Sequence, residues 1–196
     1  MRPPDRIHTE RFLLRRFARK DADAILEAVQ ASLPDLAKWL PWAHENYTRD
    51  EAVAYVRDSA QSWKEGRAFD FAIRSPNDPG HHMGNMSIWH VSRLGKVGEI
   101  GYWVRTDATS NGIATETAEA MLGLGFGTLG MHKITLRIAV GNEASDRVAE
   151  KLGFTREGIL REELKVNGAW LDHTLYSLLE HEFRASVPPP GGQSAV

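Results

Sequence analysis

The apolar residues of this chain follow helical spacing in some segments and strand spacing in others. Helical spacing begins after Asp21, which is expected to cap the first helix, and returns over 50–63, 113–129 and 143–152. Runs rich in β-branched and aromatic residues, bounded by turn formers, predict strands at 12–17, 69–74, 83–91, 97–104 and 134–140 and a hairpin over 154–178. The predicted order is one strand, two helices, three strands, and then helix, strand, helix and two strands.

This order of elements predicts a mixed sheet in an α/β chain. Short turns join the three strands between residues 69 and 104, which are therefore expected to run antiparallel. A helix lies between 97–104 and 134–140, so these two strands are expected to be parallel. A length of 196 residues is close to one domain of ~150 residues, and we expect a single domain over 1–184. The Pro- and Gly-rich residues 185–196 are expected to form a flexible tail without chemistry.

Composition and charge narrow the class of protein. Cysteine is absent, which excludes disulfides, thiolate zinc sites and a cysteine nucleophile. The net charge of -2 gives no electrostatic reason to expect a nucleic-acid partner. We find neither the apolar segment of a signal peptide nor an uncharged apolar run of ~18 residues, so we expect a cytoplasmic protein without a membrane partner. His81 and His82 have no matching carboxylate nearby, and we expect no metal.

Two junctions between predicted strands and helices carry candidate chemistry. After the strand ending at Val104, a polar turn with Gly112 leads into a helix, whose first free N–H groups suit a phosphate or pyrophosphate. This turn matches neither of the common glycine-rich phosphate motifs, and an ordinary capped helix is the alternative. At the second junction Asn142 is a natural N-cap, and Ser145 follows three residues later on the same side of the helix.

Taken together, these segments resemble the GNAT superfamily of N-acetyltransferases, which use acyl-CoA. Within it they resemble the RimJ/RimL-like branch, which acetylates protein N-terminal amines. The resemblance extends from Thr9 to Phe183. It rests on the following stretches: Thr9-Glu10-Arg11-Phe12-Leu13-Leu14-Arg15, Glu99-Ile100-Gly101-Tyr102-Trp103-Val104, Gly112-Ile113-Ala114-Thr115-Glu116, Asn142-x-x-Ser145, Lys151-Leu152-Gly153-Phe154 and Tyr176-Ser177-Leu178-Leu179.

The resemblance implies a GNAT-like α/β domain with a mostly antiparallel sheet, flanking helices and two central parallel strands that splay apart, 97–104 and 134–140. Acetyl-CoA, the implied co-substrate, would bind between these strands, and the amine would attack directly without an acyl-enzyme. The residues that the resemblance assigns to acetyl-CoA are Tyr102, Trp103, Val104, Thr109, Ser110, Asn111, Gly112, Ile113, Ala114, Thr115, Asn142 and Lys151. The family motif opens with Gln or Arg where this chain has Thr109, which predicts a weaker grip on the phosphates.

Three residues are candidates for proton transfer. Glu99 is expected to accept the proton of the amine, because Glu99, Gly101 and Trp103 share one strand face and Gly101 leaves room for substrate. A carboxylate in a surface salt bridge is the alternative for Glu99, and His90 is the rival base. Ser145 occupies the family position beside the CoA sulfur and is expected to donate to the departing thiolate. Arg147 and Lys151 lie on the same helix and could meet the adenosine 3′-phosphate of CoA, although a solvated position is the expectation for Arg147.

The sequence does not decide which molecule accepts the acetyl group. The resemblance favours a primary amine, which could be a protein N-terminus or a small molecule, and the same fold also serves polyamine and antibiotic acetyltransferases. A non-catalytic acyl-CoA-binding module is the alternative from another class. The many tryptophans, including Trp39, Trp42, Trp89 and Trp103, could line an acceptor groove or belong to the core. A homodimer is suggested by family analogy alone.

Overall fold

The strands expected from the sequence all join one mixed sheet, with one further short strand at its edge. The computed structural model describes residues 2–186, and in this part of the chain the strand order is β1-β2-β3-β4-β5-β6-β8-β7. Every neighbouring pair is antiparallel except β5 and β6, which are parallel as predicted. The bounds are β1 Arg6–His8, β2 Leu13–Arg16, β3 Ala68–Arg74, β4 His82–Ser92, β5 Val97–Val104, β6 Lys133–Ala139, β7 Thr155–Val166 and β8 Ala169–Leu179.

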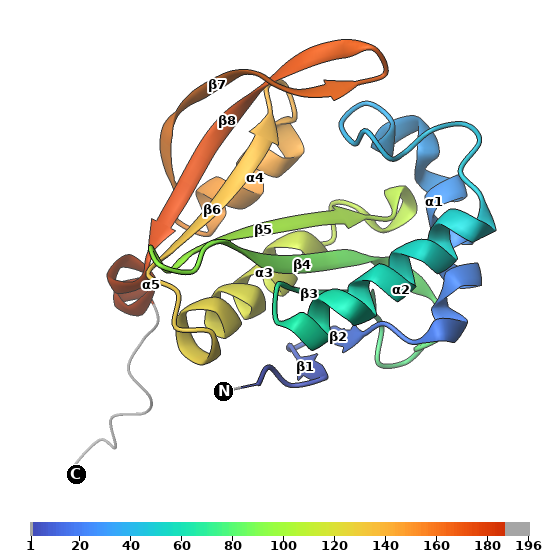
Figure 1. Ribbon diagram of the computed structural model, residues 1–196, viewed down its shortest axis with the longest axis horizontal. Helices are drawn as coiled ribbons and strands as arrows, with labels where there is room; N and C mark the ends of the chain where they lie inside the picture. Colours follow the sequence, from blue (N-terminus) through green and yellow to red (C-terminus); the bar gives the residue numbers. More distant parts are fainter. Residues whose placement is uncertain (1, 187–196) are drawn as a thin grey trace.

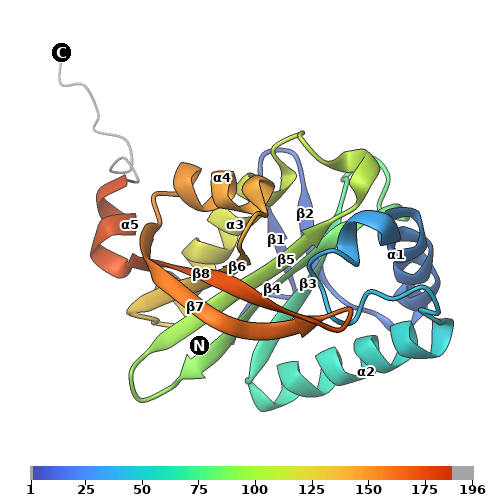
Figure 2. The same ribbon diagram turned by 90° about the horizontal axis from the view of Figure 1, so that it is seen from above.

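Helices cover both faces of this sheet. Figure 2 shows α1 and α2 on one face and α3 and α4 on the other, with α5 at the end where β8 finishes. The bounds are α1 Ala22–Leu36, α2 Arg49–Glu65, α3 Ile113–Gly123, α4 Glu143–Lys151 and α5 Glu180–Ser186. One hydrophobic cluster lies mainly between the sheet and α3, around Met86, Ile88 and Met121. A second lies under α1 and α2, around Ile25, Val29 and Trp103.

The structure departs from the predicted elements in three places. The short β1 and α5 were not predicted from the sequence, and α5 reaches Ser186, two residues past the expected end of the domain. The predicted helix 113–129 changes to a π-helical turn over Leu124–Thr128. Gly125 permits a close approach there, because a Cβ at this position would lie 2.5 Å from the Ile134 side chain. The rest of the predicted tail, 187–196, lies outside the described residues.

Asp21 lies at the start of α1 but acts differently from the predicted cap. Its carboxylate makes no capping bond to α1. It pairs instead with Arg15 at 2.8 Å and with Arg74 at 3.3 Å, and it accepts a hydrogen bond of 2.6 Å from the Ala18 backbone. The Arg74 side chain is only 1% exposed, so its charge needs a counter-ion close by. The Asp21 carboxylate is that counter-ion, and it therefore turns toward Arg74 and not toward α1. The interaction ties α1 to β2 and β3.

The hairpin of β7 and β8 extends across the molecule toward α1, as Figure 1 shows. At its turn, Asn167 Nδ2 donates a hydrogen bond of 2.7 Å to the carbonyl oxygen of Ala37, directly after α1. The hairpin and α1 therefore meet above the central strands. Within residues 2–186, no helix combines the length and apolar character needed to cross a bilayer.

We predict that Asp21→Asn lowers the free energy of unfolding by about 3–5 kcal/mol at neutral pH, because it leaves the buried Arg74 charge without its counter-ion. The matched control is Asp58→Asn on α2, whose exposed pair with Arg57 should contribute less than about 1 kcal/mol. Urea unfolding of both variants measures the difference.

The Asp21–Arg74 ion pair also predicts how the stability difference between wild type and Asp21→Asn depends on pH. Burial acts to raise the pKa of Asp21, but the Arg15 hydrogen bond, the Ala18 N–H and the charges of Arg15 and Arg74 together hold it below its ordinary value. A lowered folded-state pKa means that the stabilisation is complete above the unfolded pKa of ~3.9 and is lost as pH falls through the folded value. The gap between wild type and Asp21→Asn should therefore shrink below about pH 4. An equal gap at pH 3 and pH 7 would contradict this account.

Candidate active site

The parallel strands β5 and β6 pair over only three residues and then separate. Their ladder joins Val97 to Lys133, Gly98 to Ile134, and ends with Glu99 and Thr135. Beyond this point β5 stays paired with β4 as far as Val104, and β6 stays paired with β8 as far as Ala139. Figure 1 shows the two strands diverging along their length. The backbone groups of β5 that face this gap after Glu99 have no ladder partner on β6, and such groups need a partner from solvent or a ligand.

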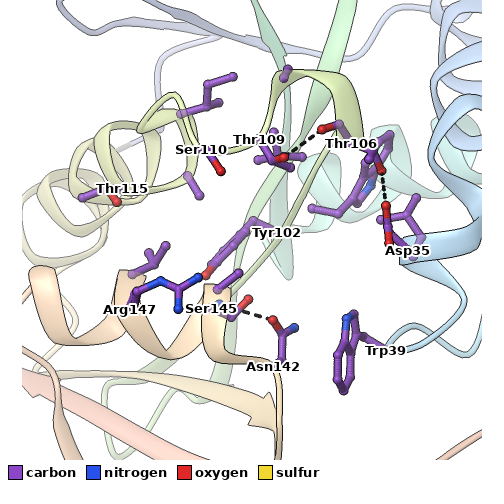
Figure 3. A pocket seen from close by; sticks show the side chains of 18 of the residues that line it. Asp35, Trp39, Tyr102, Thr106, Thr109, Ser110, Thr115, Asn142, Ser145 and Arg147 are labelled. Atoms are coloured by element: carbon purple, nitrogen blue, oxygen red, sulfur yellow. Dashed lines mark hydrogen bonds between the residues drawn. The ribbon is translucent and has the colours of Figure 1, made fainter.

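One cavity of about 490 Å³, which we name the loop pocket, opens beside the end of β5. It is bounded by the loop before α3, the first turns of α3 and α4, and the end of α1 (Figure 3). Most residues that the sequence assigned to acetyl-CoA meet here. These are Tyr102, Trp103, Val104, Thr109, Ser110, Gly112, Ile113, Ala114, Thr115, Asn142 and Lys151, together with Ser145.

The loop before α3 exposes backbone N–H groups to the loop pocket. Gly112 adopts a left-handed conformation with φ of 75°, and the first bond inside the helix runs from Glu116 N to Gly112 O. The N–H groups of Ile113, Ala114 and Thr115 precede that bond and have no helical acceptor. A concentrated negative charge such as a pyrophosphate is the natural partner for such a helix start.

Asn111 and Thr109 shape this loop from within. The Asn111 amide donates hydrogen bonds of 3.2 Å to the carbonyl oxygens of Ala108 and Thr109, and Asn111 does not line the pocket. The Thr109 hydroxyl donates to the Thr106 carbonyl at 2.7 Å. The hydroxyl hydrogen of Thr109 is therefore already used within the loop. Its grip on the phosphates should be weaker still than the sequence alone predicts.

An N-terminal segment supports the same loop from outside. Arg11 Nε and the Arg11 backbone N–H donate to the carboxylate of Glu116 at 2.7 and 2.8 Å, and Arg11 Nη1 donates to the Asn111 carbonyl oxygen at 3.0 Å. The Thr9 hydroxyl donates to the same carboxylate at 2.6 Å. The segment that contributed to the family resemblance therefore fixes the position of the loop and of the first turn of α3.

Positive charge reaches the loop pocket from α4. Lys151 and Arg147 both line it, and the Arg147 guanidinium is 61% exposed, 3.6 Å from Glu143. Arg147 is solvated, as expected, but it also lines the pocket. Figure 3 shows its side chain at the pocket wall. Helical spacing places both cations on one side of α4, and this side faces the loop pocket.

A second cavity of about 250 Å³, the inter-strand pocket, lies where β5 and β6 separate. Glu99 lines it and is only 6% exposed. Arg137 Nε donates to the Glu99 carboxylate at 2.9 Å and Arg137 also pairs with Glu163. Burial raises the pKa of Glu99, and the hydrogen bond and charge of Arg137 act in the opposite direction. Glu99 thus lies in the cavity, as expected of a base. It also forms a salt bridge, as the alternative expected, but the carboxylate is buried and not at the surface.

Tyr102, Asn142 and Ser145 line both of these cavities. The Asn142 side chain caps α4 by accepting from the Ser145 N–H at 3.3 Å, which confirms the predicted cap. The Tyr102 hydroxyl is buried and has no hydrogen-bond partner among the described residues. Burial raises the pKa of Tyr102 to about 12. The phenol therefore keeps its proton at neutral pH and remains available as a donor.

The residues around Gly101 differ from the sequence expectation in two ways. Cross-strand pairs put Glu99 opposite Trp89 and Gly101 opposite Ser87, whereas His90 pairs with Gly98 and lies on the other sheet face. His90 lines neither of the two cavities described above. The space above Gly101 is occupied by the Trp89 ring, because a Cβ at Gly101 would lie 2.9 Å from it. Gly101 therefore makes room for Trp89.

Residues from the end of α1 and from the segment that follows it complete the walls. Asp35, Leu36, Trp39 and Leu40 line the loop pocket, and Trp39 and Leu40 also line the inter-strand pocket. The sequence named Trp39 as a residue that could line a groove, but the distance along the chain between Trp39 and β5 concealed that both line the same pocket. Among residues 2–186 no group of three or more His, Cys, Asp or Glu is arranged to hold a metal ion.

Comparisons with known proteins agree with this geometry. Residues 11–155 match the family described as the acetyltransferase (GNAT) domain. YdaF of Bacillus subtilis, named as a candidate ribosomal N-acetyltransferase, is 30% identical over 89% of this chain and 94% of its own length. Spermidine N(1)-acetyltransferase of Escherichia coli is 25% identical over 57% of this chain and 60% of its own.

A solved structure of Mycobacterium smegmatis RimJ in complex with CoA-disulfide matches with a TM-score of 0.81 and 26% identity. The match covers 95% of this chain and 97% of RimJ. The family model alone spans well over half of the chain, and the parted β5 and β6 agree with the fold that the sequence implied. The chain therefore belongs to the GNAT acetyltransferase family, and within it the chain is similar to RimJ/RimL-like enzymes.

Proposed function

We propose that this protein transfers an acetyl group from acetyl-CoA to a primary amine in the gap between β5 and β6. The observation that carries the proposal is the junction of the loop pocket and the inter-strand pocket at Tyr102, Asn142 and Ser145. One cavity offers an anion site at a helix start, and the other offers a buried carboxylate. An acyl donor and an amine entering from the two sides would meet beside Tyr102.

The loop pocket is the proposed donor site. The N–H groups of Ile113, Ala114 and Thr115 would bind the pyrophosphate, and Lys151 and Arg147 would add positive charge. The pantetheine would then run toward the gap along β5. Backbone N–H groups of β5 between Tyr102 and Val104 would donate to the thioester oxygen, where negative charge develops during attack.

The inter-strand pocket is the proposed site of proton transfer. The amine must lose a proton to become nucleophilic, and Glu99 would take it, directly or through one water. The amine nitrogen forms a bond to the acetyl carbon and the carbon–sulfur bond breaks. Ser145 would donate its hydroxyl hydrogen bond to the departing thiolate, with the protonated Tyr102 phenol beside it. His90 is not part of this proposal, because it lines neither the loop pocket nor the inter-strand pocket.

A protein N-terminus or a small amine is the proposed acceptor class. The names of the relatives support both, since one relative is named for ribosomal N-acetylation and another for spermidine. The direct test is mass spectrometry of a panel of peptides and small amines after incubation with acetyl-CoA. Acetylated amine with equimolar CoA release supports the transferase. Binding of CoA without turnover on any amine would favour the non-catalytic acyl-CoA-binding module instead. A cytoplasmic location and a homodimer stay predictions.

One prediction of this proposal concerns the loop before α3. Gly112→Val should weaken CoA binding by more than tenfold, because a Cβ there would lie 3.0 Å from Arg11 Nη2 and disturb the guanidinium that supports the loop, and a side chain is strained at φ of 75°. Gly130→Val is the matched control: it has the same left-handed backbone, with φ of 62°, but does not line the loop pocket. Calorimetric titration with CoA and thermal unfolding separate the two effects. Equal loss of affinity in both variants would identify Gly112 as a purely structural glycine.

Glu99→Gln should leave the affinity for CoA unchanged and lower kcat by about 10²–10⁴. Burial raises the pKa of Glu99, so the wild-type rate should fall as pH drops through that raised value, where the carboxylate becomes protonated. This limb should be absent from the pH–rate profile of the variant. Glu157→Gln is the control, because it also removes an ion pair, with Lys133, away from the described cavities. A pH profile unchanged in Glu99→Gln would make Glu99 a structural carboxylate.

Ser145→Ala should lower kcat by roughly tenfold to a thousandfold with little change in CoA affinity, because the contact strengthens only as charge develops on sulfur. Ser110→Ala should show the opposite pattern, because the Ser110 hydroxyl lies on the proposed phosphate loop. This variant should lower the affinity for CoA more than it lowers kcat. Steady-state kinetics and CoA titration of both variants measure this. Normal turnover with a normal melting curve in Ser145→Ala would refute its role as acid and leave the transferase proposal intact.

A further inference from the structure

A third cavity of about 500 Å³, the aromatic pocket, lies under α1 and α2 against the face of the sheet that carries Glu99. Five aromatic rings line it, from the segment after α1, from α2, from β4 and from β5. These are Trp42, Tyr47, Tyr55, Trp89 and Trp103. Neither the proposed donor site nor the proposed proton transfer uses this cavity.

The walls of the aromatic pocket are fixed by a buried amide. With the oxygen of Asn85 turned toward the pocket, it accepts from the Tyr55 hydroxyl and from Trp103 Nε1, each at 3.2 Å. The Asn85 nitrogen then donates to His82 Nε2 at 2.7 Å. Burial lowers the pKa of His82 to about 3, so its ring is neutral and can accept that bond. The polar atoms of Tyr55 and Trp103 are thus used within the protein, and their rings are held in place for another partner.

The charge on the pocket walls is negative. Asp70 and Glu51 line it, and no Lys, Arg or His is among the described residues that do so. Hydrogen bonds from the backbone and hydroxyl of Thr48 and from His44 lower the pKa of Glu51, which keeps it ionised. The Asp70 carboxylate is partly buried, yet it makes no ion pair or hydrogen bond with any residue of 2–186. Aromatic faces together with an unpaired carboxylate match a cation.

The aromatic pocket lies beside the proposed reaction centre. Asp70 pairs with Ser87 across β3 and β4, and Ser87 pairs with Gly101 across β4 and β5, so the three form one row across the sheet. Two strand spacings put the backbones of Asp70 and Gly101 about 10 Å apart. Gly101, Tyr102 and Trp89 line both the aromatic pocket and the inter-strand pocket. A molecule with its reacting amine at Tyr102 could extend a flexible arm to Asp70.

We propose that the aromatic pocket binds a second positive charge carried by the acceptor, an ammonium or guanidinium group several bonds away from the amine that is acetylated. The proposal rests on the proposed function and narrows its substrate class to acceptors with two cations. Two sources share this chemistry: a small diamine, and a peptide whose first residue is Lys or Arg. The cation would sit against the rings of Trp42, Trp89 and Trp103 with Asp70 as counter-ion.

Binding to the pocket is measured first without turnover. Choline and its neutral isostere 3,3-dimethylbutan-1-ol are titrated into the wild-type protein, with tryptophan fluorescence as the signal. We expect choline to bind about tenfold more tightly than the neutral isostere. In Asp70→Asn this preference should largely disappear, whereas Asp58→Asn on the outer side of α2 should retain it. Equal binding of choline and the alcohol to wild type would overturn the cation site.

Turnover then identifies the source of the second charge. The pairs are 1,4-diaminobutane against butylamine, and a peptide that starts with Lys against the same peptide starting with norleucine. We expect at least a tenfold higher kcat/KM for the dicationic member of one pair, which names the source. Asp70→Asn should remove this advantage through KM with kcat unchanged, and a normal melting curve would show that the variant is folded.

The outcomes separate the two proposals. Acetylation of all four acceptors without preference for the second charge would overturn the cation site and leave the transferase proposal standing. An equal loss on one-charge and two-charge acceptors in Asp70→Asn would also overturn it, since a structural role predicts that result. Selective choline binding with no acetylation of any amine would support the cation site and count against the transferase proposal.

Discussion

The structure depends on the place where β5 and β6 stop pairing. A parallel pair in the middle of a sheet normally continues its ladder, because unpaired buried backbone groups are costly. Here the ladder ends at Glu99 and Thr135, while each strand keeps its antiparallel partner on the other side. The strands therefore remain rigid although the sheet is opened between them. The opening supplies backbone donors and acceptors with no internal partner, and both proposed reaction pockets are arranged along it.

Ion pairs hold the parts that surround this opening. Arg137 joins Glu99 on β5 to Glu163 on β7 just past the last paired residues. The Glu116 carboxylate accepts hydrogen bonds from Thr9 and Arg11 and so fixes the loop before α3. Asp21, with Arg15 and Arg74, fixes the start of α1, whose far end lines the loop pocket. The Glu99–Arg137 pair lies at the opening itself, whereas the other two groups position its walls through the loop before α3 and through α1.

Much of the fold could be predicted from the sequence because long elements carry a clear period. The strands 97–104 and 134–140 and their parallel arrangement were predicted from runs of β-branched residues and the helix between them. β1 and α5 are too short for a period to be visible. The π-helical turn at 124–128 depends on how Gly125 packs against Ile134, a contact made across the fold.

The candidate site was predictable where its residues are neighbours in the sequence. The loop 109–115 and the Asn142 cap lie in continuous motifs, and both line the loop pocket. The sequence suggested that Trp42, Trp89 and Trp103 could line a groove, and all three line the aromatic pocket. The other lining residues, such as Tyr55 and Asp70, come from separate segments, so no local pattern placed them beside these rings. Asp21 shows the same limit, since its position suggested a helix cap and only the fold brings the buried Arg74 beside it.

The central claim is that the opening between β5 and β6 receives the acyl donor through backbone groups. Hydrogen–deuterium exchange measured by mass spectrometry, with and without saturating CoA, tests this claim most directly. The account predicts that CoA slows exchange in the peptides covering 100–104 and 110–115 and leaves β1 and β2 unchanged. Protection confined to other segments, or no protection at saturating CoA, would contradict it.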